Sequence, residues 1–248
     1  MRPTPSRIVF VTGFTVALNV SGAVSLMAEK TENSAGSTIL DQDFRILSIA
    51  DNKALGVRRL QASDDGKAVE IVETATMDFH DKKVGWTSTV IYPKERPVLK
   101  ASAETTVDGE RRMEGSVSFD HAKGVLQMSG NFIKDGQVSP LPLPTGDVSI
   151  AKGTILFQSA LSVIGPQLLR EPGTIDEIVL AEFPDDVHGL VQFKEGFRLE
   201  RTAMDSDGGF TLKLHGPHGT DPVATVTFDG QGNVVSEDLG KLRYSPAP

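Results

Sequence analysis

Apolar and polar side chains alternate along most of the chain, in short segments that end at turn-forming residues. The period is two over residues 117–119 and 125–129, as expected where one face of a sheet packs on a core and the other meets water. The pattern predicts a mainly β protein with strands over residues 44–49, 56–62, 69–79, 84–92, 98–107, 112–119, 125–133, 175–183, 189–193, 197–204, 210–215, 224–228 and 241–244.

Asp-Gly pairs separate many of these segments and predict hairpins. Glycine accepts a positive φ freely and aspartate tolerates it better than most residues, which suits the tight turns between antiparallel strands. Because several strands are nine to eleven residues long, right-handed twist accumulates along them and favours a curved sheet over a flat one. The five pairs lie at residues 65–66, 108–109, 135–136, 207–208 and 229–230.

One segment has a helical period instead. Phe157, Leu161, Ile164 and Leu168 are spaced by four, three and four residues, so they share one face of a helix that we expect to begin at about Thr154. The Gly-Pro pair at 165–166 is expected to end this helix, with a short second turn through 168–169. We therefore predict a strongly twisted antiparallel meander, a β-spiral or half-barrel, wrapped around one central helix.

The first residues have the features of a cleavable export signal. Arg2 and Arg7 precede an apolar stretch over residues 8–20, and Ala23 gives a small side chain before the expected cleavage site, with the bond after Ala28 as second choice. The stretch is shorter than the roughly 20 residues that cross a bilayer, so no membrane anchor is expected after cleavage. We predict a signal peptide at 1–23, a flexible tether at 24–41, a single β-rich domain at 42–248, and a periplasmic or secreted location.

Composition removes several classes of function. The chain has no cysteine, which excludes disulfides, thiol catalysis and a lipid anchor on cysteine, and the export signal then favours a bacterial-type envelope protein. The formal net charge is −8; without Arg2 and Arg7, 23 basic residues face 33 acidic ones, a net charge of about −10. Acidic and basic residues are interspersed, so no nucleic-acid surface is expected.

Three motifs resemble chemical sites, and each has a simpler interpretation. Ser149 and Lys152 have the Ser-x-x-Lys spacing of serine acyltransferases, without the later Lys-Thr-Gly strand of that family. His215 and His218, with Asp221, lie in one tight turn and could hold a divalent metal, although a polar hairpin is favoured and no fourth ligand is evident. The Asp-Ser-Asp-Gly-Gly segment at 205–209 favours a hairpin over a calcium loop. No metal and no cofactor are predicted.

Four apolar or aromatic residues are the candidate ligand contacts. Trp86 and Tyr92 have the same parity, so a continuous strand places them on one face of the sheet. Either they pack in the core or they line a concave ligand surface. Together with Phe157 and Leu161 of the expected helix, they form the ligand-binding set that the sequence suggests.

The order of elements resembles exported bacterial envelope proteins of the EipB-like β-spiral type. The resemblance rests on Leu141-Pro142, Gly153-Thr154 and Leu156-Phe157 and on the order of elements over residues 44–244. The cysteine pair of that family is absent, and Gln158-Ser159 replaces its histidine-bearing helix start. A looser likeness is to half-barrel carriers of the LolA and LolB type. The resemblance implies a nonenzymatic protein that acts in cell-envelope integrity.

We therefore expect a noncatalytic exported protein that binds an apolar or envelope-derived partner, with lipid as one possibility, on a curved sheet. A pure scaffold would instead have its concave face packed by Phe157, Leu161 and Ile164, whereas a carrier would have an open apolar cavity there. An unrecognised metal-dependent enzyme is a third alternative, and clustering of His188, His215 and His218 would indicate it.

Overall fold

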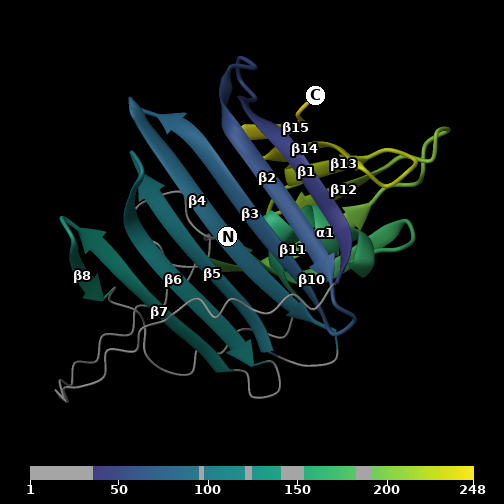
Figure 1. Ribbon diagram of the computed structural model, residues 1–248. Helices are drawn as coiled ribbons and strands as arrows, with labels where there is room; N and C mark the ends of the chain where they lie inside the picture. The colour runs from purple at the N-terminus through teal and green to yellow at the C-terminus, as the bar shows by residue number, and fades with distance from the viewer. Residues whose placement is uncertain (1–35, 95–97, 121–124, 141–153, 183–191) are drawn as a thin grey trace, which may run out of the picture. The chain divides into compact units, whose positions relative to one another are not determined.

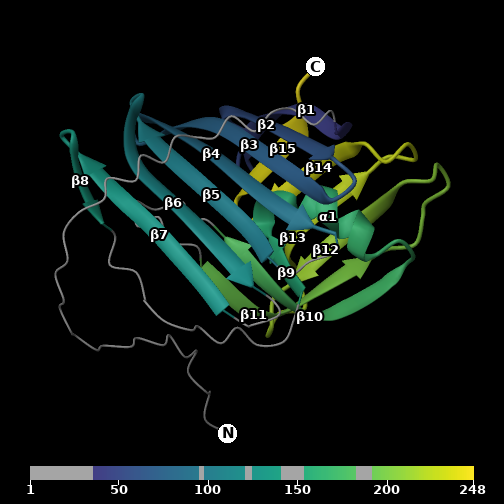
Figure 2. The same ribbon diagram turned by 60° about the horizontal axis from the view of Figure 1, so that its bottom comes forward.

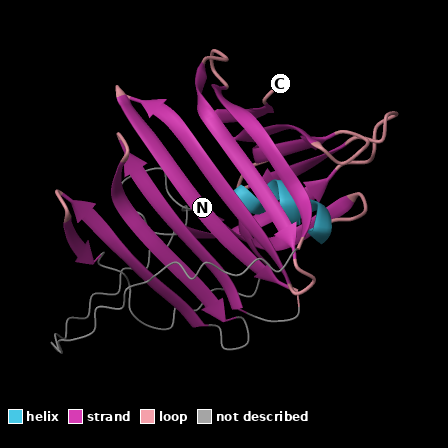
Figure 3. Ribbon diagram, viewed as in Figure 1, coloured by secondary structure: helices cyan, strands magenta, loops and turns pink. Residues whose placement is uncertain are grey.

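The computed structural model describes residues 36–94, 98–120, 125–140, 154–182 and 192–248. Residues 35–248 form one compact unit, and nearly all of the described elements are strands (Figure 3). The first strands are β1 (Ser37–Ser48), β2 (Ala54–Asp64), β3 (Ala68–Phe79), β4 (Lys82–Pro93), β5 (Val98–Val107), β6 (Glu110–Asp120), β7 (Val125–Lys134) and β8 (Gln137–Pro140). The expected signal peptide at 1–23 lies outside the described residues.

The second set of elements begins with a short strand and a helix. These are β9 (Thr154–Phe157), a single 3-10 turn (Gln158–Ala160) and α1 (Leu161–Leu168). The remaining strands are β10 (Gly173–Glu182), β11 (Gln192–Arg201), β12 (Phe210–His215), β13 (Pro222–Phe228), β14 (Val234–Leu239) and β15 (Leu242–Pro246).

All the strands belong to one open sheet. Its order is β8-β7-β6-β5-β4-β3-β2-β1-β15-β14-β13-β12-β11-β10-β9, a meander whose two halves meet where β1 pairs with β15 (Figure 1). Among the described strands, every pairing is antiparallel except that of β9 with β10. The sheet does not close on itself, and α1 lies against one of its faces (Figure 2). The predicted fold class, a long antiparallel meander with one helix, is confirmed.

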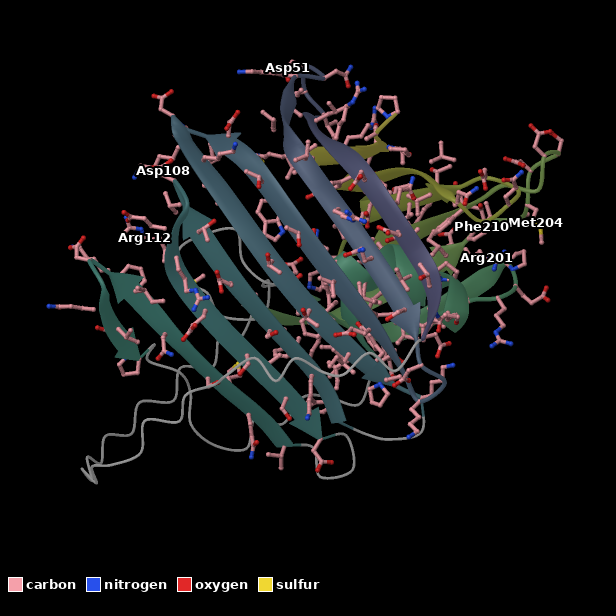
Figure 4. The ribbon with its side chains drawn as sticks, in the orientation of Figure 1. Asp51, Asp108, Arg112, Arg201, Met204 and Phe210 are labelled. Carbon is pink, nitrogen blue, oxygen red and sulfur yellow. The ribbon has the colours of Figure 1, made fainter. Side chains whose placement is uncertain are left out.

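The Asp-Gly pairs form the turns that the sequence predicts. All five lie between consecutive antiparallel strands, and in two of them both residues have positive φ: Asp108 at 53° with Gly109 at 83°, and Asp135 at 51° with Gly136 at 74°. These are the dihedral signs of the two-residue turn that matches strand twist. Figure 4 shows Asp108 at the tip of the β5–β6 hairpin.

The helix differs from its prediction at both ends. Residues 154–157 are the strand β9, not the first turn of a helix, because Ile155, Leu156 and Phe157 are all buried and pair in parallel with β10. Periodicity does not distinguish such a fully buried strand from a helix. At the other end, α1 continues through Pro166 to Leu168. A Cβ on Gly165 would lie 2.6 Å from Leu212 Cδ1, so this glycine lets the short helix pack closely on β12.

The bounds of several strands also differ from their predictions. Residues 37–41, expected at the end of the tether, belong to β1. Residues 192–193 and 197–201 of the two segments expected at 189–193 and 197–204 belong to one strand, β11, which continues through Gly196 with its positive φ of 80°. Residues 189–191 lie outside the described residues, and residues 202–204 follow the end of β11. The pattern did not predict β14 or the four-residue edge strand β8. The sequence also predicts an extended connector over the proline-rich residues 140–144; Pro140 ends β8, and residues 141–144 lie outside the described residues.

The core joins both halves of the sheet to the helix. One hydrophobic cluster contains residues of β1–β6, of β9 and α1, and of β10–β15. Arg201 fixes the end of α1: its Nη1 donates to the carbonyl oxygens of Leu169 at 2.9 Å and Arg170 at 2.5 Å, and its guanidinium lies over the Phe210 ring (Figure 4). Fully buried members of the cluster include Phe44, Ile46, Leu60, Phe157, Leu161, Leu199, Leu212 and Leu214.

Candidate functional site

The four sequence-predicted contact residues lie on the core side of the molecule. Phe157 and Leu161 are fully buried, whereas Trp86 and Tyr92 are half-buried and pack against the same cluster. The backbone N–H of Phe157 donates to the Tyr92 hydroxyl oxygen at 2.7 Å, which ties β9 to β4. Burial raises the pKa of the Tyr92 hydroxyl, so this group is neutral. The ligand-binding role of these four residues stays a prediction.

Side chains pack the inner face of the sheet around α1. Phe157 and Leu161 have no exposed surface, and Ile164 is 6% exposed. This is the arrangement expected of a scaffold and not the open apolar cavity expected of a carrier.

A buried charge cluster lies within this packed interior, and the sequence pattern did not identify it. Arg58 of β2 donates through Nε to Glu73 Oε1 of β3 at 2.7 Å and through Nη1 to Glu237 Oε2 of β14. The Ser88 hydroxyl donates to Glu73 Oε2 at 3.4 Å. The Tyr244 ring lies 4.6 Å from the Arg58 guanidinium carbon, a distance that permits a cation–π contact.

Burial and charge act in opposite directions on the pKa values of this cluster. Burial alone lowers the pKa of Arg58, but the carboxylates of Glu237 and Glu73 more than offset it and raise the pKa. For Glu237, burial dominates and raises the carboxyl pKa, while Arg58 opposes the rise and Glu73 adds to it. One guanidinium therefore faces two carboxyl groups, and burial raises the carboxyl pKa of Glu237.

The cluster is closed off from solvent. The side chains of Arg58 and Glu237 have no exposed surface and that of Glu73 is 9% exposed. Among the described residues, Arg58 Nη2 and Glu237 Oε1 have no hydrogen-bond partner. A buried ion pair of this kind is costly to break, because the remaining charge stays uncompensated.

A hollow of the described surface lies on the other face of the sheet, across β4–β7. It has a volume of about 520 Å³. Thr89 and Ile91 of β4 line it, whereas their neighbours Ser88 and Val90 are buried on the core side; successive side chains of a strand point to opposite faces. The complete lining is Thr89, Ile91, Lys100, Ala101, Ser102, Ser116, Val117, Ser118, Gln127, Met128 and Ser129. We call this hollow the outer groove.

Strand register arranges the polar residues of the outer groove in rows. Thr89, Ser102, Ser116 and Ser129 are paired in sequence across four strands, about 4.8 Å apart in the hydrogen-bonding direction. The hydroxyl oxygens of Ser116 and Ser129 lie 2.7 Å apart. The next row holds Ile91, Lys100, Ser118 and Gln127. The ammonium of Lys100 is the one formal charge among the described lining residues.

A smaller groove of about 220 Å³ lies on β1–β3. Its lining includes Asp41 and Glu70, and Asp41 is already paired with Arg59 through two hydrogen bonds of 3.0 Å. The outer groove is the larger of the two and carries no carboxylate among its described lining residues.

The motifs considered for chemistry do not form a site in the described part of the chain. Ser149, Lys152 and His188 lie outside the described residues. His215 is bound to Thr220 and Glu200. No group of three or more histidine or acidic side chains in the described residues could hold a metal ion.

The segment at 205–209 is a hairpin turn, as expected. Asp205 Oδ1 accepts the backbone N–H groups of Asp207 and Gly209 at 3.0 and 2.7 Å. No helix in the described residues has the length and apolar character that a bilayer crossing requires.

The fold and its packed interior define an open β-meander protein with an internal helix. No family model and no curated protein matches the chain. A similar solved structure is that of a beta-barrel-like protein of domain of unknown function DUF1849 from Brucella abortus, with a TM-score of 0.47 and 11% sequence identity over 83% of this chain and 93% of that chain. At this similarity the likeness carries no functional argument, and the fold assignment rests on the strand order above. Membership of the EipB-like family stays a prediction.

Proposed function

We propose that this chain is a nonenzymatic envelope protein that, after export, binds an envelope-derived partner in the outer groove. The observation that carries the proposal is the groove itself, a hollow of about 520 Å³ on the face of β4–β7 opposite to the core. It lies on long, regularly paired strands, which hold binding residues more rigidly than loops do.

Packing of the inner face supports an interaction protein over an acyl-chain carrier. A lipid tail would need an apolar cavity beside α1, and Phe157, Leu161 and Ile164 fill that position. A scaffold that binds on its outer surface needs no such cavity.

The lining of the outer groove favours a hydroxyl-rich partner such as an envelope glycan. Its described residues offer five hydroxyl groups, one amide and one ammonium, together with apolar floor atoms. Each hydroxyl both donates and accepts hydrogen bonds, which suits a sugar. One lysine is too little positive charge for a nucleic acid but suits a glycan that carries a carboxylate.

The same lining argues against catalysis in the groove. General acid–base chemistry needs a positioned group such as a histidine or carboxylate within hydrogen-bond reach of the reacting atoms. The described lining residues include neither type, and Arg58, Glu73 and Glu237 are buried on the opposite face.

Calorimetric titration of the mature protein with soluble peptidoglycan fragments tests the proposal. Ser116→Trp fills the groove and should weaken binding by at least about tenfold, or about 1.4 kcal/mol. Thr74→Trp is the matched control, because Thr74 is exposed on the outer face of β3 and does not line the groove. Equal affinity of both variants would exclude the groove as the binding site.

Native mass spectrometry of protein purified from its own envelope tests the alternative. A copurified acyl lipid that survives Ser116→Trp would support the carrier and overturn the present proposal. Lipid-free protein that still binds the glycan fragments would support the interaction role.

A further inference from the structure

The outer groove and the smaller groove on β1–β3 lie on the same face of the sheet. Val72 lines the smaller groove, whereas its neighbours Ile71 and Glu73 are buried on the core side. Because successive side chains of a strand point to opposite faces, the smaller groove lies on the face opposite to the core. The outer groove lies on that face as well, so one ligand can contact both.

Strand pairing brings the two grooves together. Val72 of the smaller groove pairs directly with Thr89 of the outer groove. Glu70 and Ile91 form the next such pair across the same two strands. Directly paired side chains on one face lie about 5 Å apart, and β3 and β4 are neighbours in the sheet (Figure 1). No described element therefore separates the two grooves.

The hydroxyl row of the outer groove continues through the smaller groove. Val72 pairs with Gln61 of β2, which pairs with Asp41 of β1. On the other side, the row runs from Thr89 to Ser129 of β7. The row thus crosses β1 to β7, and six intervals of about 4.8 Å give a length of roughly 29 Å, compared with roughly 14 Å for the outer groove alone.

The combined lining suits a chain of sugars that lies across the strands. The hydroxyl groups of the outer groove and the amide of Gln61 can donate and accept hydrogen bonds along the row. Val72 and Ile91 are diagonal neighbours where the grooves meet, and they offer apolar atoms to the C–H face of a sugar ring. A sugar ring in an extended chain is about as long as the spacing between strands, so successive rings can meet successive strands.

Charge restricts the kind of glycan. Lys100 lines the outer groove, whereas Asp41 and Glu70 line the smaller one. Asp41 is paired with Arg59, and Glu70 has no ion-pair partner among the described residues. A chain with a carboxylate on every sugar would place negative charge beside Glu70, and like charges in contact are unfavourable. The lining therefore disfavours a polyanionic chain.

We infer that the outer groove and the smaller groove form one continuous binding track for an extended, linear glycan that is neutral or carries few carboxylates. The glycan lies across the strands, with its rings over β1–β7. This inference rests on the proposed function and deepens it, because the outer groove alone needs only a short ligand whereas the track needs a long one.

Calorimetric titration of the mature protein with chitooligosaccharides, neutral linear chains of N-acetylglucosamine, tests the track. The trimer should occupy the outer groove and the hexamer both grooves, so the hexamer should bind at least about tenfold more tightly. Val72→Trp obstructs the junction and should reduce the affinity for the hexamer to that for the trimer. Its unchanged affinity for the trimer would show that the variant is folded.

Two further variants define where the hexamer lies. Gln61→Trp obstructs the smaller groove from an exposed position and should also remove the advantage of the hexamer. Thr74→Trp is the matched control, because Thr74 lies on the same strand and face as Val72 but lines neither groove, and it should bind both oligomers like the wild type.

The charge restriction has its own test. The hexamer oxidised to a carboxylate at C6 of every ring should bind more weakly than the neutral hexamer. Glu70→Gln should reduce this difference, because it removes the negative charge beside the chain. Tighter binding of the oxidised hexamer to the wild type would overturn the assignment of a neutral or sparsely charged glycan.

Failure of the track can be distinguished from failure of the proposed function. If Ser116→Trp weakens binding of the trimer but the wild type binds trimer and hexamer equally, the outer groove binds glycans and the track is wrong. A hexamer advantage that persists in both Val72→Trp and Gln61→Trp would also overturn the track. A wild type that binds neither oligomer would overturn the glycan proposal and the track together.

Discussion

Arg58 and Glu237 are 179 residues apart in sequence and form an ion pair in the interior of the protein. They lie on β2 and β14, which are separated in the sheet by β1 and β15. The pair therefore spans two intervening strands on the core face, and Glu73 extends it to β3. It connects the two halves of the meander beside the pairing of β1 with β15.

Arg58→Met should destabilise the protein by about 3–5 kcal/mol, because it leaves two buried carboxyl groups without their cation. Urea denaturation followed by circular dichroism measures the change. Arg59→Met is the matched control: this neighbour points to the other face, and its ion pair with Asp41 is exposed to solvent. Since exposed pairs contribute little, the control should unfold like the wild type. Equal losses in both variants would show that the interior pair has no special role.

The pH dependence of the free energy of unfolding should show the contribution of the buried Glu237 carboxyl group. Burial raises the pKa of its carboxyl above the ordinary value of 4.5, so the folded state binds this proton more tightly than the unfolded state. The contribution of this carboxyl group to the free energy of unfolding is then fully present below the ordinary pKa. It is lost as pH rises through the folded-state pKa. Compared with Glu237→Gln, the wild type should lose stability as pH rises from about 4.5.

Urea midpoints of the wild type and Glu237→Gln at a series of pH values measure this difference. Asp238→Asn provides a control at the next position, where the carboxylate pairs with Arg243 near the surface. A wild-type advantage that increases with pH would mean that Arg58 determines the protonation of Glu237 and burial does not.

Phe157→Ala should cost about 3–5 kcal/mol, since it deletes a fully buried aromatic side chain between β9 and the core. Phe79→Ala is the matched control, because Phe79 is 55% exposed at the end of β3 and should change stability far less. A loss below about 1 kcal/mol for Phe157→Ala in chemical denaturation would show that this side chain is not part of the core.

Alternation and turn chemistry were sufficient to predict the meander. The β5 segment, residues 98–107, was predicted with its observed bounds, because a regular alternating strand between turns has one interpretation. Residues 154–157 were not, because three consecutive buried residues fit a helix as well as a buried strand. Pro166 was expected to end α1, and packing of Gly165 on Leu212 outweighs that local preference.

The charge cluster was missed although its parity was present in the sequence. Arg58 alternates in step with the buried Leu60 and Ala62, and Glu73 in step with Ile71 and Ala75. A charged residue in the apolar register of a strand is a signal of a buried ion pair. Its partner on β14 could not be deduced, because that pairing depends on how the sheet curves. The outer groove was also missed, since serine and threonine at its positions are typical of any strand face that is exposed to solvent.

The position of β15 has a consequence for how the protein is made. This strand follows all the other described strands in sequence, yet it lies between β1 and β14 in the middle of the sheet. Its contact with β1 joins residues about two hundred positions apart, and such distant pairings form slowly. Neither half can be joined to the other until synthesis has passed Pro246, so a prematurely terminated chain would expose two unpaired strand edges to degradation and aggregation.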